Sequence, residues 1–364
     1  MKITINKSTL ESIISNFQPF LEKRDLSQIT SHILIETKGN EVILKATDYE
    51  IGIIAKIQNE NIDKDEKVTV NGRKFLDSLK NLKDDKIQIE NKDDKIQIIQ
   101  NRTKITLHSF IADNFPESPK DYKNSKINID SKNLVESLKK LLPVIEINNP
   151  RAEYRNALID IKEYKFSFVA TDTKRLEVIS FNNQSVDKIN FMIPKKAISE
   201  IQKFFNDEAN LYFSENNIII ENDKYTFWTR IPNGNFIDYE KVIPKDIKHK
   251  IIINKEKMIE ALKIINSISN QVKLIFNKNK IIFESISDED SKAITEIELD
   301  SELNKEFINN IGEDENICVN SRHILDFIIN INSQNFEFGI NENKNSACIL
   351  KSDNFILTMM PILI

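Results

Sequence analysis

The sequence predicts an α+β fold built from three tandem copies of one domain. A segment in which a strand runs into a helix recurs three times, at a constant spacing of 124 residues. A second helix recurs at spacings of 123 and 126 residues, and runs of alternating apolar and polar residues lie between the two helices. Because self-similarity at a long fixed period marks a repeated structural unit, three copies account for most of the 364 residues.

The first helix of each copy follows a short strand that begins at Ile5, Ile129 or Ile253. The apolar residues that follow each strand are spaced as on one face of a helix. The expected first helices cover residues 7–24, 131–145 and 254–269.

The second helix of each copy follows a segment that begins at Val70, Ile193 or Val319. The expected second helices cover residues 72–82, 194–205 and 321–332.

Half-buried antiparallel strands are expected between the helices, because runs such as 41–46 and 165–170 alternate apolar and polar residues. Thr47-Asp48 and Thr171-Asp172 each follow such a run, and Thr-Asp suits the turn that ends a strand. Antiparallel sheets and two helices per copy are therefore predicted, in domains that span residues 1–121, 122–247 and 248–364.

Positive charge is concentrated on the helices of an acidic chain. The six expected helices carry a combined formal charge of +8, whereas the whole chain carries −5 and the remainder therefore −13. Lysines and arginines lie opposite the apolar face in three of these helices. Solvated lysines explain one such face, and recurrence across copies favours a surface that faces phosphates.

Composition and motifs exclude several other classes of protein. With 40% hydrophobic and 29% charged residues the chain is typical of globular proteins, and it has no apolar leader and no run long enough to span a membrane. Cys318 and Cys348 have no CxxC spacing, and the four histidines are scattered. We therefore expect a cytoplasmic protein without a catalytic centre, a metal site or a cofactor.

Five motifs, taken together in this order, resemble the bacterial DNA polymerase III beta subunit, the beta sliding clamp, over essentially the full length. The motifs begin at Asp113 (Asp-Asn-Phe-Pro), Val169 (Val-Ala-Thr-Asp-Thr-Lys-Arg-Leu), Ile193 (Ile-Pro-Lys-Lys), Asn235 (Asn-Phe-Ile-Asp-Tyr-Glu-Lys-Val-Ile-Pro-Lys) and Met360 (Met-Pro-Ile-Leu-Ile). The resemblance implies a ring-forming homodimer, joined head to tail, with sheets outside and helices lining the hole.

The resemblance also implies the partners. These are double-stranded DNA without sequence specificity, the polymerase catalytic subunit, the clamp loader and other proteins that carry a clamp motif. No intrinsic catalysis is implied. The alternative is an interaction scaffold or a DNA-binding protein that forms no ring. A ring clamp should stay on closed circular DNA and leave it after linearisation, whereas a groove or end binder should respond little to DNA topology.

A peptide-binding pocket between the second and third domains is implied by the same resemblance. The matching residues are Thr171, Lys174, Arg175, Leu176, Pro244, Ile247, Asn320, His323, Ser346, Thr358, Met360, Pro361 and Ile362. The chain departs from the family pattern at three places: Lys174 replaces the usual histidine, Arg155 replaces an apolar residue, and the usual arginine before the last residue is missing. These departures affect the peptide preference.

Two further surfaces are expected. The residues expected to face DNA are Arg24, Arg73, Lys74, Lys80, Lys132, Lys139, Lys140, Arg151, Tyr154, Arg155, Lys195, Lys196 and Lys203. The positions that match the dimer interface of the family are Ile105, Leu107 and Ile268, each of which ordinary packing explains equally well.

Overall fold

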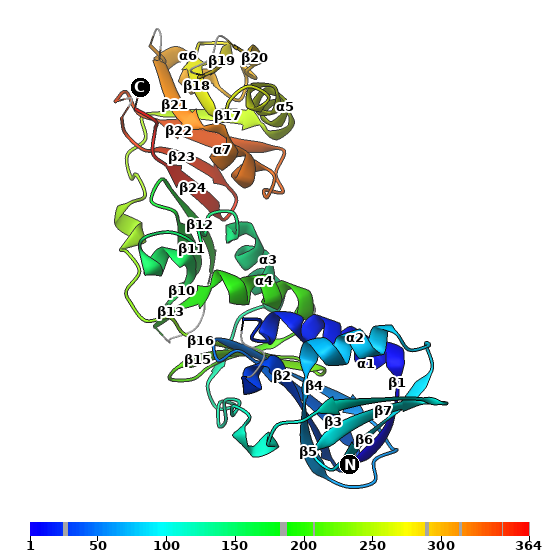
Figure 1. Ribbon diagram of the computed structural model, residues 1–364. Helices are drawn as coiled ribbons and strands as arrows, with labels where there is room; N and C mark the ends of the chain where they lie inside the picture. The colour runs from blue at the N-terminus through cyan, green and yellow to red at the C-terminus, as the bar shows by residue number, and fades with distance from the viewer. Residues whose placement is uncertain are drawn as a thin grey trace. The chain divides into compact units, whose positions relative to one another are not determined.

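The computed structural model describes residues 1–24, 28–182, 188–206, 208–287, 291–312, 315–343 and 345–363 (Figure 1). Strands and helices alternate along the chain in three similar series, and each series contains eight strands of the described chain.

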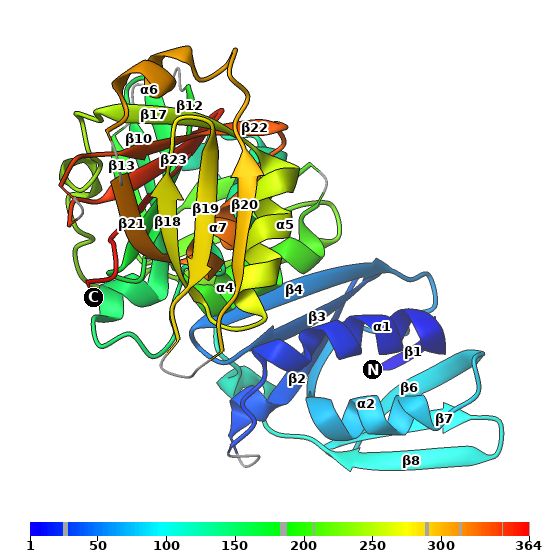
Figure 2. The same cartoon turned by 90° about the horizontal axis from the view of Figure 1, so that it is seen from above.

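The first series follows the expected order of strand, helix, strands, helix and strands. Its elements are β1 (Lys2–Asn6), α1 (Lys7–Phe17), β2 (His32–Lys38), β3 (Glu41–Thr47), β4 (Ile51–Gln58), β5 (Glu66–Asn71), α2 (Gly72–Lys80), β6 (Lys86–Lys92), β7 (Lys95–Gln100) and β8 (Thr103–His108). Helices α1 and α2 contact each other and lie side by side (Figure 2).

The second series repeats this order. Its elements are β9 (Lys126–Ile127), α3 (Ser131–Leu141), β10 (Asn156–Lys162), β11 (Lys165–Thr171), β12 (Arg175–Asn182), β13 (Ile189–Pro194), α4 (Lys195–Phe204), β14 (Asn210–Phe213), β15 (Asn217–Glu221) and β16 (Tyr225–Arg230).

The third series contains one helix more than expected. Its elements are β17 (His249–Asn254), α5 (Lys255–Asn266), β18 (Gln271–Phe276), β19 (Lys280–Ser285), β20 (Ile294–Glu298), α6 (Lys305–Asn310), β21 (Glu315–Asn320), α7 (Ser321–Ile328), β22 (Asn335–Ile340), β23 (Cys348–Ser352) and β24 (Phe355–Met359). The additional helix α6 has six residues and buries only Phe307, so it lacks the apolar periodicity that would predict it.

Several helices are shorter than the apolar pattern predicts. Helix α3 ends at Leu141, two residues before Pro143, because a proline disfavours helical backbone in the residue before it. Helix α7 ends at Ile328 instead of residue 332. The starts agree better, since Asn71 and Asn320 cap α2 and α7 by accepting hydrogen bonds from backbone N–H groups.

Four antiparallel sheets organise the described strands, and two of them join strands from neighbouring series. The strand orders are β1-β6-β7-β8, β5-β2-β3-β4-β16-β15-β14-β9, β13-β10-β11-β12-β24-β23-β22-β17 and β20-β19-β18-β21. In the eight-stranded sheets, β4 pairs with β16 and β12 pairs with β24. The first and third series therefore each keep one four-stranded sheet with unpaired edges.

The chain forms two compact units, each with its own core. One unit comprises Met1–Val135 and Lys196–Ile231, and the other comprises Glu136–Lys195 and Pro232–Ile364. Aromatic rings fill both cores. In the first unit Phe20 lies edge-on to Phe227 at 6.0 Å, and in the second Phe327 contacts Phe355 at 4.6 Å between ring centroids.

Candidate functional site

The residues expected to bind a peptide centre on the turn between β11 and β12. The Thr171 hydroxyl donates to the Arg175 carbonyl at 2.7 Å and accepts from the Thr173 N–H at 3.1 Å. Asp172 accepts from the N–H groups of Lys174 and Arg175, both at 2.9 Å. This closed network fixes the turn and leaves the Lys174 side chain exposed.

The end of the chain lies against this turn. The Met360 N–H donates to the Lys174 carbonyl at 2.8 Å, and the Ile362 N–H donates to the Cys318 carbonyl at 2.7 Å. Both hydrogen bonds fix the backbone of the chain end, and the Met360 side chain has half of its surface exposed. Ile364, the last residue of the chain-end motif, lies outside the described residues.

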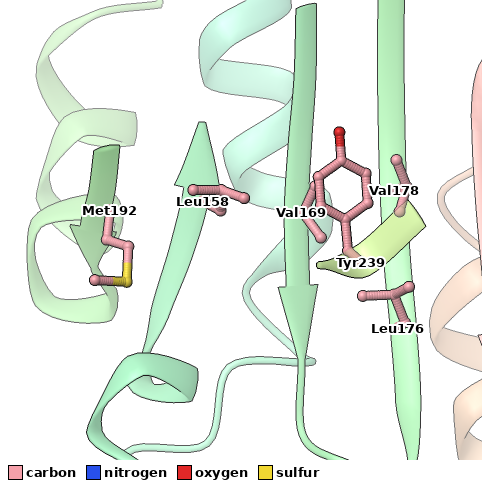
Figure 3. Packing of buried hydrophobic residues seen from close by; sticks show 6 residues of the cluster. All are labelled: Leu158, Val169, Leu176, Val178, Met192 and Tyr239. Carbon is pink, nitrogen blue, oxygen red and sulfur yellow. The ribbon is translucent and has the colours of Figure 1, made fainter. Parts of the chain in front are cut away.

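An apolar base lies under the turn. Leu176 is opposite Thr358 in the β12–β24 pair, and both side chains are buried. Figure 3 shows Leu176 beside Val178 on β12, with the ring of Tyr239 next to them. The Tyr239 hydroxyl donates to Asp160 at 2.8 Å, which fixes the covering segment on the sheet. This segment was not expected in the site, although its sequence belongs to one of the family motifs.

The guanidinium of Arg175, which was expected in the pocket, is held by groups within the protein. It is buried and donates to Asp172 at 3.1 Å, to Asp326 of α7 at 2.7 Å and to the Pro143 carbonyl at 2.9 Å. With its donors directed at these three acceptors, Arg175 positions the β12 turn. A sequence shows the charge of an arginine but not its partners.

A buried carboxyl next to Leu176 was missed from the sequence. Glu177 is 1% exposed, and both of its carboxyl oxygens lack a hydrogen-bond partner among the described residues. Burial raises the pKa of Glu177 to about 8, against the opposing effect of Arg175, whose Nη1 lies 3.9 Å away. Nothing in the local sequence distinguishes it from an exposed strand residue.

His323 belongs to the same cluster of charges. Burial, together with the positive charge of Arg175, lowers the pKa of His323 to about 4. The imidazole is therefore neutral at pH 7, as a wall for an apolar ligand requires.

The remaining expected pocket residues are half-buried. These are Pro244, Ile247, Asn320, Ser346, Pro361 and Ile362. Ile247 packs against β22 at Gly339. A Cβ added at Gly339 would lie only 2.8 Å from the Ile247 side chain. Asn320 is already the cap of α7, with its side chain accepting from Arg322. The hydrogen bond of Ser346 is local, from its N–H to the Asn343 carbonyl.

The basic residues of α2 form an exposed group. Arg73, Lys74 and Lys80 are exposed, whereas Phe75 and Leu79 on the opposite side are buried. No ion pair involves these three cations in the part of the chain that the structure describes. Helix α2 therefore presents uncompensated positive charge.

The basic residues of α3 differ in exposure. Lys132 and Lys139 are exposed, and Lys140 is half-buried with its Nζ 5.7 Å from the centre of the Phe355 ring. That distance allows a cation–π contact, so Lys140 is partly engaged within the protein.

The lysines of α4 differ from those of α2, because each has an intramolecular partner. Lys195 is half-buried and donates to the Ile145 carbonyl, and burial lowers its pKa. Lys196 pairs with Asp48, and Lys203 donates to both oxygens of the buried Glu200 at 2.8 Å. The spacing of three residues between Glu200 and Lys203 could have predicted this ion pair, because residues three apart are neighbours on a helix.

The remaining expected DNA contacts divide by exposure. Arg24, Arg151 and Arg155 are exposed, whereas Tyr154 is 3% exposed and does not present its ring to a phosphate. Tyr154 instead supports Arg151, whose Nη1 lies 3.1 Å from the tyrosine hydroxyl. The Arg155 Nε donates to the Asn149 carbonyl at 2.7 Å, which restrains that side chain.

The expected seam residues lie at unpaired edges. Ile105 and Leu107 are half-buried on β8, the last strand of its sheet. Ile268 follows α5, a helix that packs against the edge strand β20, and is 39% exposed. Ile294, the first residue of β20, is 55% exposed and was not predicted as a seam residue.

The described residues contain no group of three or more His, Cys, Asp or Glu side chains that could hold a metal ion. Over the same residues, no helix combines the length and apolar character needed to cross a membrane. Cys318 and Cys348 form no disulfide, and burial raises the pKa of Cys348 to about 12, which keeps its thiol unreactive.

Three family models match the chain in succession. The N-terminal domain of the DNA polymerase III beta subunit matches residues 1–119, the central domain matches residues 129–238 and the C-terminal domain matches residues 240–362.

Known proteins align with the chain from end to end. The beta sliding clamp of Helicobacter pylori is 34% identical over an alignment of 373 residues that covers 100% of both sequences. The crystal structure of the H. pylori beta clamp bound to a DNA ligase peptide has a TM-score of 0.92 at 33% identity and covers 100% of both chains. The DNA polymerase III beta subunit of Pseudomonas aeruginosa shares the fold, with a TM-score of 0.91 at 21% identity and full coverage of both chains.

Proposed function

Because the chain belongs to the DNA polymerase III beta subunit family, the bacterial beta sliding clamps, we propose that two copies close a ring around duplex DNA and tether the replicative polymerase to it. Members of this family are processivity factors, not catalysts. The observation that carries the proposal is the repeated sheet junction, which occurs twice within the chain and leaves one four-stranded sheet without such a junction at each end of the series.

Three domains are proposed, with residues 1–121, 122–247 and 248–364 in succession. Each range holds eight strands of the described chain, β1–β8, β9–β16 and β17–β24. The successive matches of three family models support the same division.

The repeat predicts which strands meet between protomers. Strand β4 of the first domain pairs with β16, the last strand of the second, and β12 of the second domain pairs with β24, the last strand of the third. By the same rule, β20 of the third domain pairs with β8 of a second copy, because β8 is the last strand of the first domain. A head-to-tail contact of this kind closes after two chains, so that neither β8 nor β20 stays as an exposed edge that invites aggregation.

The apolar residues at these edges support the pairing. Strand β16 pairs with β4 so that Phe227 lies opposite Ile53, which lies opposite Ala46 on β3. The corresponding residues of the open edges are Ile105 and Ala293, because Ala293 lies opposite Ser285, the residue of β19 that matches Ala46. Ile294, the next residue along β20, is unusually exposed for an isoleucine within a strand, and burial at the edge of the partner protomer accounts for it. Ile268 and Leu107 then complete an apolar seam.

Affinity for DNA in this proposal is electrostatic and independent of base sequence. The exposed cations of α2 and α3 are suited to phosphates, which carry no sequence information. A ring that is retained by topology needs only weak, salt-sensitive attraction, because strong contacts would prevent sliding. Because Lys195, Lys196 and Lys203 have partners within the protein, α4 contributes less to the attraction of phosphates than α2.

The turn of Lys174 and the chain end are proposed to hold the linear motif of partner proteins, including the polymerase subunit and the clamp loader. Leu176 provides the apolar base, Met360 an adaptable wall and His323 a neutral imidazole. The H. pylori beta clamp, which binds a DNA ligase peptide, supports a site of this kind. Since the DNA and polymerase partners of a bacterial clamp are cytoplasmic, we place the chain there.

The dimer is tested by the solution mass of the Ile268→Asp variant. The wild-type chain should have a mass of about 85 kDa, twice the 42.3 kDa of one chain. Ile268 is 39% exposed within one chain, so aspartate is tolerated there, but a buried, unpaired charge at the seam should release folded monomers.

The matched control is Ile147→Asp, because Ile147 is 63% exposed in the second domain, away from both proposed seams. This control should remain dimeric. An Ile268→Asp variant that stays wholly dimeric would contradict the proposed seam.

A further inference from the structure

The turn before β4 has the same construction as the turn before β12, where the proposed peptide site lies. The hydroxyls of Thr47 and Thr171 each donate to the carbonyl oxygen four residues later, at 2.8 Å and 2.7 Å. Tyr49 and Thr173 each place the third residue of the turn in the left-handed region, with φ values of 73° and 79°. The same frame is therefore present at both sheet junctions.

The strands that follow the two turns also correspond. The Arg230 N–H donates to the Glu50 carbonyl at 2.9 Å, as the Met360 N–H donates to the Lys174 carbonyl at 2.8 Å. Arg230 therefore holds the place of Met360, and Glu50 holds the place of Lys174. The first junction thus offers a similar backbone with different side chains.

An indole ring replaces the aliphatic base at the first junction. Trp228 is opposite Gly52 in the β4–β16 pair, where Thr358 is opposite Leu176 in the other pair. The ring lies over Gly52 so closely that an added Cβ would be 2.0 Å from it. Trp228 is 5% exposed and packs against Tyr212 and Ile219, which fixes the ring.

A cleft of about 360 Å³ lies at this junction. Its lining residues are Thr47, Tyr49, Pro116, Glu117, Ser118, Pro119, Asn217, Trp228 and Arg230. The Tyr49 side chain is 56% exposed, and the two prolines are half-buried. Aromatic and proline faces with a few polar groups are typical of sites that bind a short extended peptide.

One cation of the cleft is available to a ligand. Asp48 and Glu50 share Lys196, and Glu117 pairs with Lys120. Arg230 is exposed, and its guanidinium has no ion pair among the residues that the structure describes. A planar guanidinium beside aromatic rings matches a carboxylate next to an apolar side chain.

We propose that this cleft is a second peptide-docking site, for an extended segment of a partner protein in which an acidic residue adjoins an aromatic or aliphatic one. Arg230 binds the carboxylate, and Tyr49 and Trp228 contact the apolar side chain. The site differs from the Met360 site in its charge, so the two select different segments.

Trp228 is the single tryptophan of the chain, so its fluorescence reports on this cleft directly. The probe is a capped hexapeptide, Ser-Asp-Phe-Asp-Leu-Ser, which contains no tryptophan or tyrosine. Titration of the full-length protein with this peptide should change the tryptophan emission in a saturable way. A peptide with lysine in place of both aspartates should not change it.

Two variants at equivalent positions separate the sites. Arg230→Glu, at an exposed position, should weaken the tryptophan response at least about tenfold, the usual effect of losing a hydrogen bond to a charged group. Met360→Ala should leave that response unchanged while it weakens binding of a labelled clamp-motif peptide. The second measurement tests the proposed function separately from this cleft.

Three results would overturn the second site. The first is the absence of any change in emission at millimolar concentrations of the acidic peptide. The second is a response that Arg230→Glu leaves intact. The third is a response to single-stranded oligonucleotides that is stronger than the response to the peptide, which would assign the aromatic and basic groups to nucleic acid.

Discussion

The buried carboxyl of Glu177 should make the stability of the protein depend on pH in a way that a single substitution removes. The change is Glu177→Gln, which keeps the size of the side chain but cannot ionise. Both carboxyl oxygens lack a hydrogen-bond partner among the described residues, so the amide loses no described hydrogen bond. Arg175 keeps its donors to Asp172 and Asp326.

The sign follows from the direction of the pKa shift. The pKa of Glu177 is about 8 in the folded chain against 4.5 for an ordinary glutamate. Between these values the unfolded chain releases a proton that the folded chain retains, so the wild type loses stability as the pH rises from 4.5 to 8. At about 1.4 kcal/mol for each pKa unit, the loss has an upper limit of roughly 5 kcal/mol.

The assay is urea denaturation followed by circular dichroism, in a series of buffers from pH 5 to pH 8. Glu177→Gln should have nearly the stability of the wild type at pH 5 and an increasing advantage toward pH 8, because every other titrating group contributes equally to both proteins. The control Glu163→Gln removes an exposed carboxyl from the same domain and should show no such divergence. Parallel pH profiles for wild type and Glu177→Gln would refute the reasoning.

Two further predictions concern the DNA and peptide surfaces. Replacing Arg73, Lys74 and Lys80 together by glutamine should lower retention on DNA and flatten the log–log salt dependence of binding by about 0.9 for each lost phosphate contact, with dimer mass unchanged. An unchanged slope would mean that these cations are only solvated surface groups of α2 and do not contact phosphates. Deleting the chain from Met360 onward should spare dimerisation but abolish binding of a clamp-motif peptide, since a buried Leu or Phe of that peptide contributes about 1.5–3 kcal/mol; equal dissociation constants in a fluorescence titration would place the pocket elsewhere.

The repeated frame was predictable because each copy is encoded locally. Apolar periodicity and the asparagine caps place α2 and α7, and the Thr-Asp pairs at residues 47 and 171 end strands as expected. The pairing of β4 with β16 was not predicted from the residues, because strands far apart in sequence leave no local signal of their partner.

The partners of charged side chains were also not predictable from the sequence. The sequence shows Arg175 and Lys195 as cations, whereas the fold buries the first among Asp172, Asp326 and the Pro143 carbonyl and directs the second to a carbonyl group. Charge is a property of a residue, but availability of that charge depends on burial and on neighbours that tertiary structure supplies. The cations of α2 have no ion pair among the described residues, whereas those of α4 already have partners within the protein.

The ring is tested most directly by locking it around DNA. Monomers with both Ile105→Cys and Ala293→Cys, reduced and mixed with closed circular plasmid, should form disulfides between protomers on oxidation, since the two residues are predicted to lie opposite each other across the seam. The chain with Ile105→Cys alone is the control.

Covalent rings should stay on the circular plasmid in molar salt, which removes contacts to phosphate, and should leave it when a restriction enzyme linearises the DNA. Release from circular and linear plasmid to the same extent, with the protomers cross-linked, would contradict a clamp held by topology.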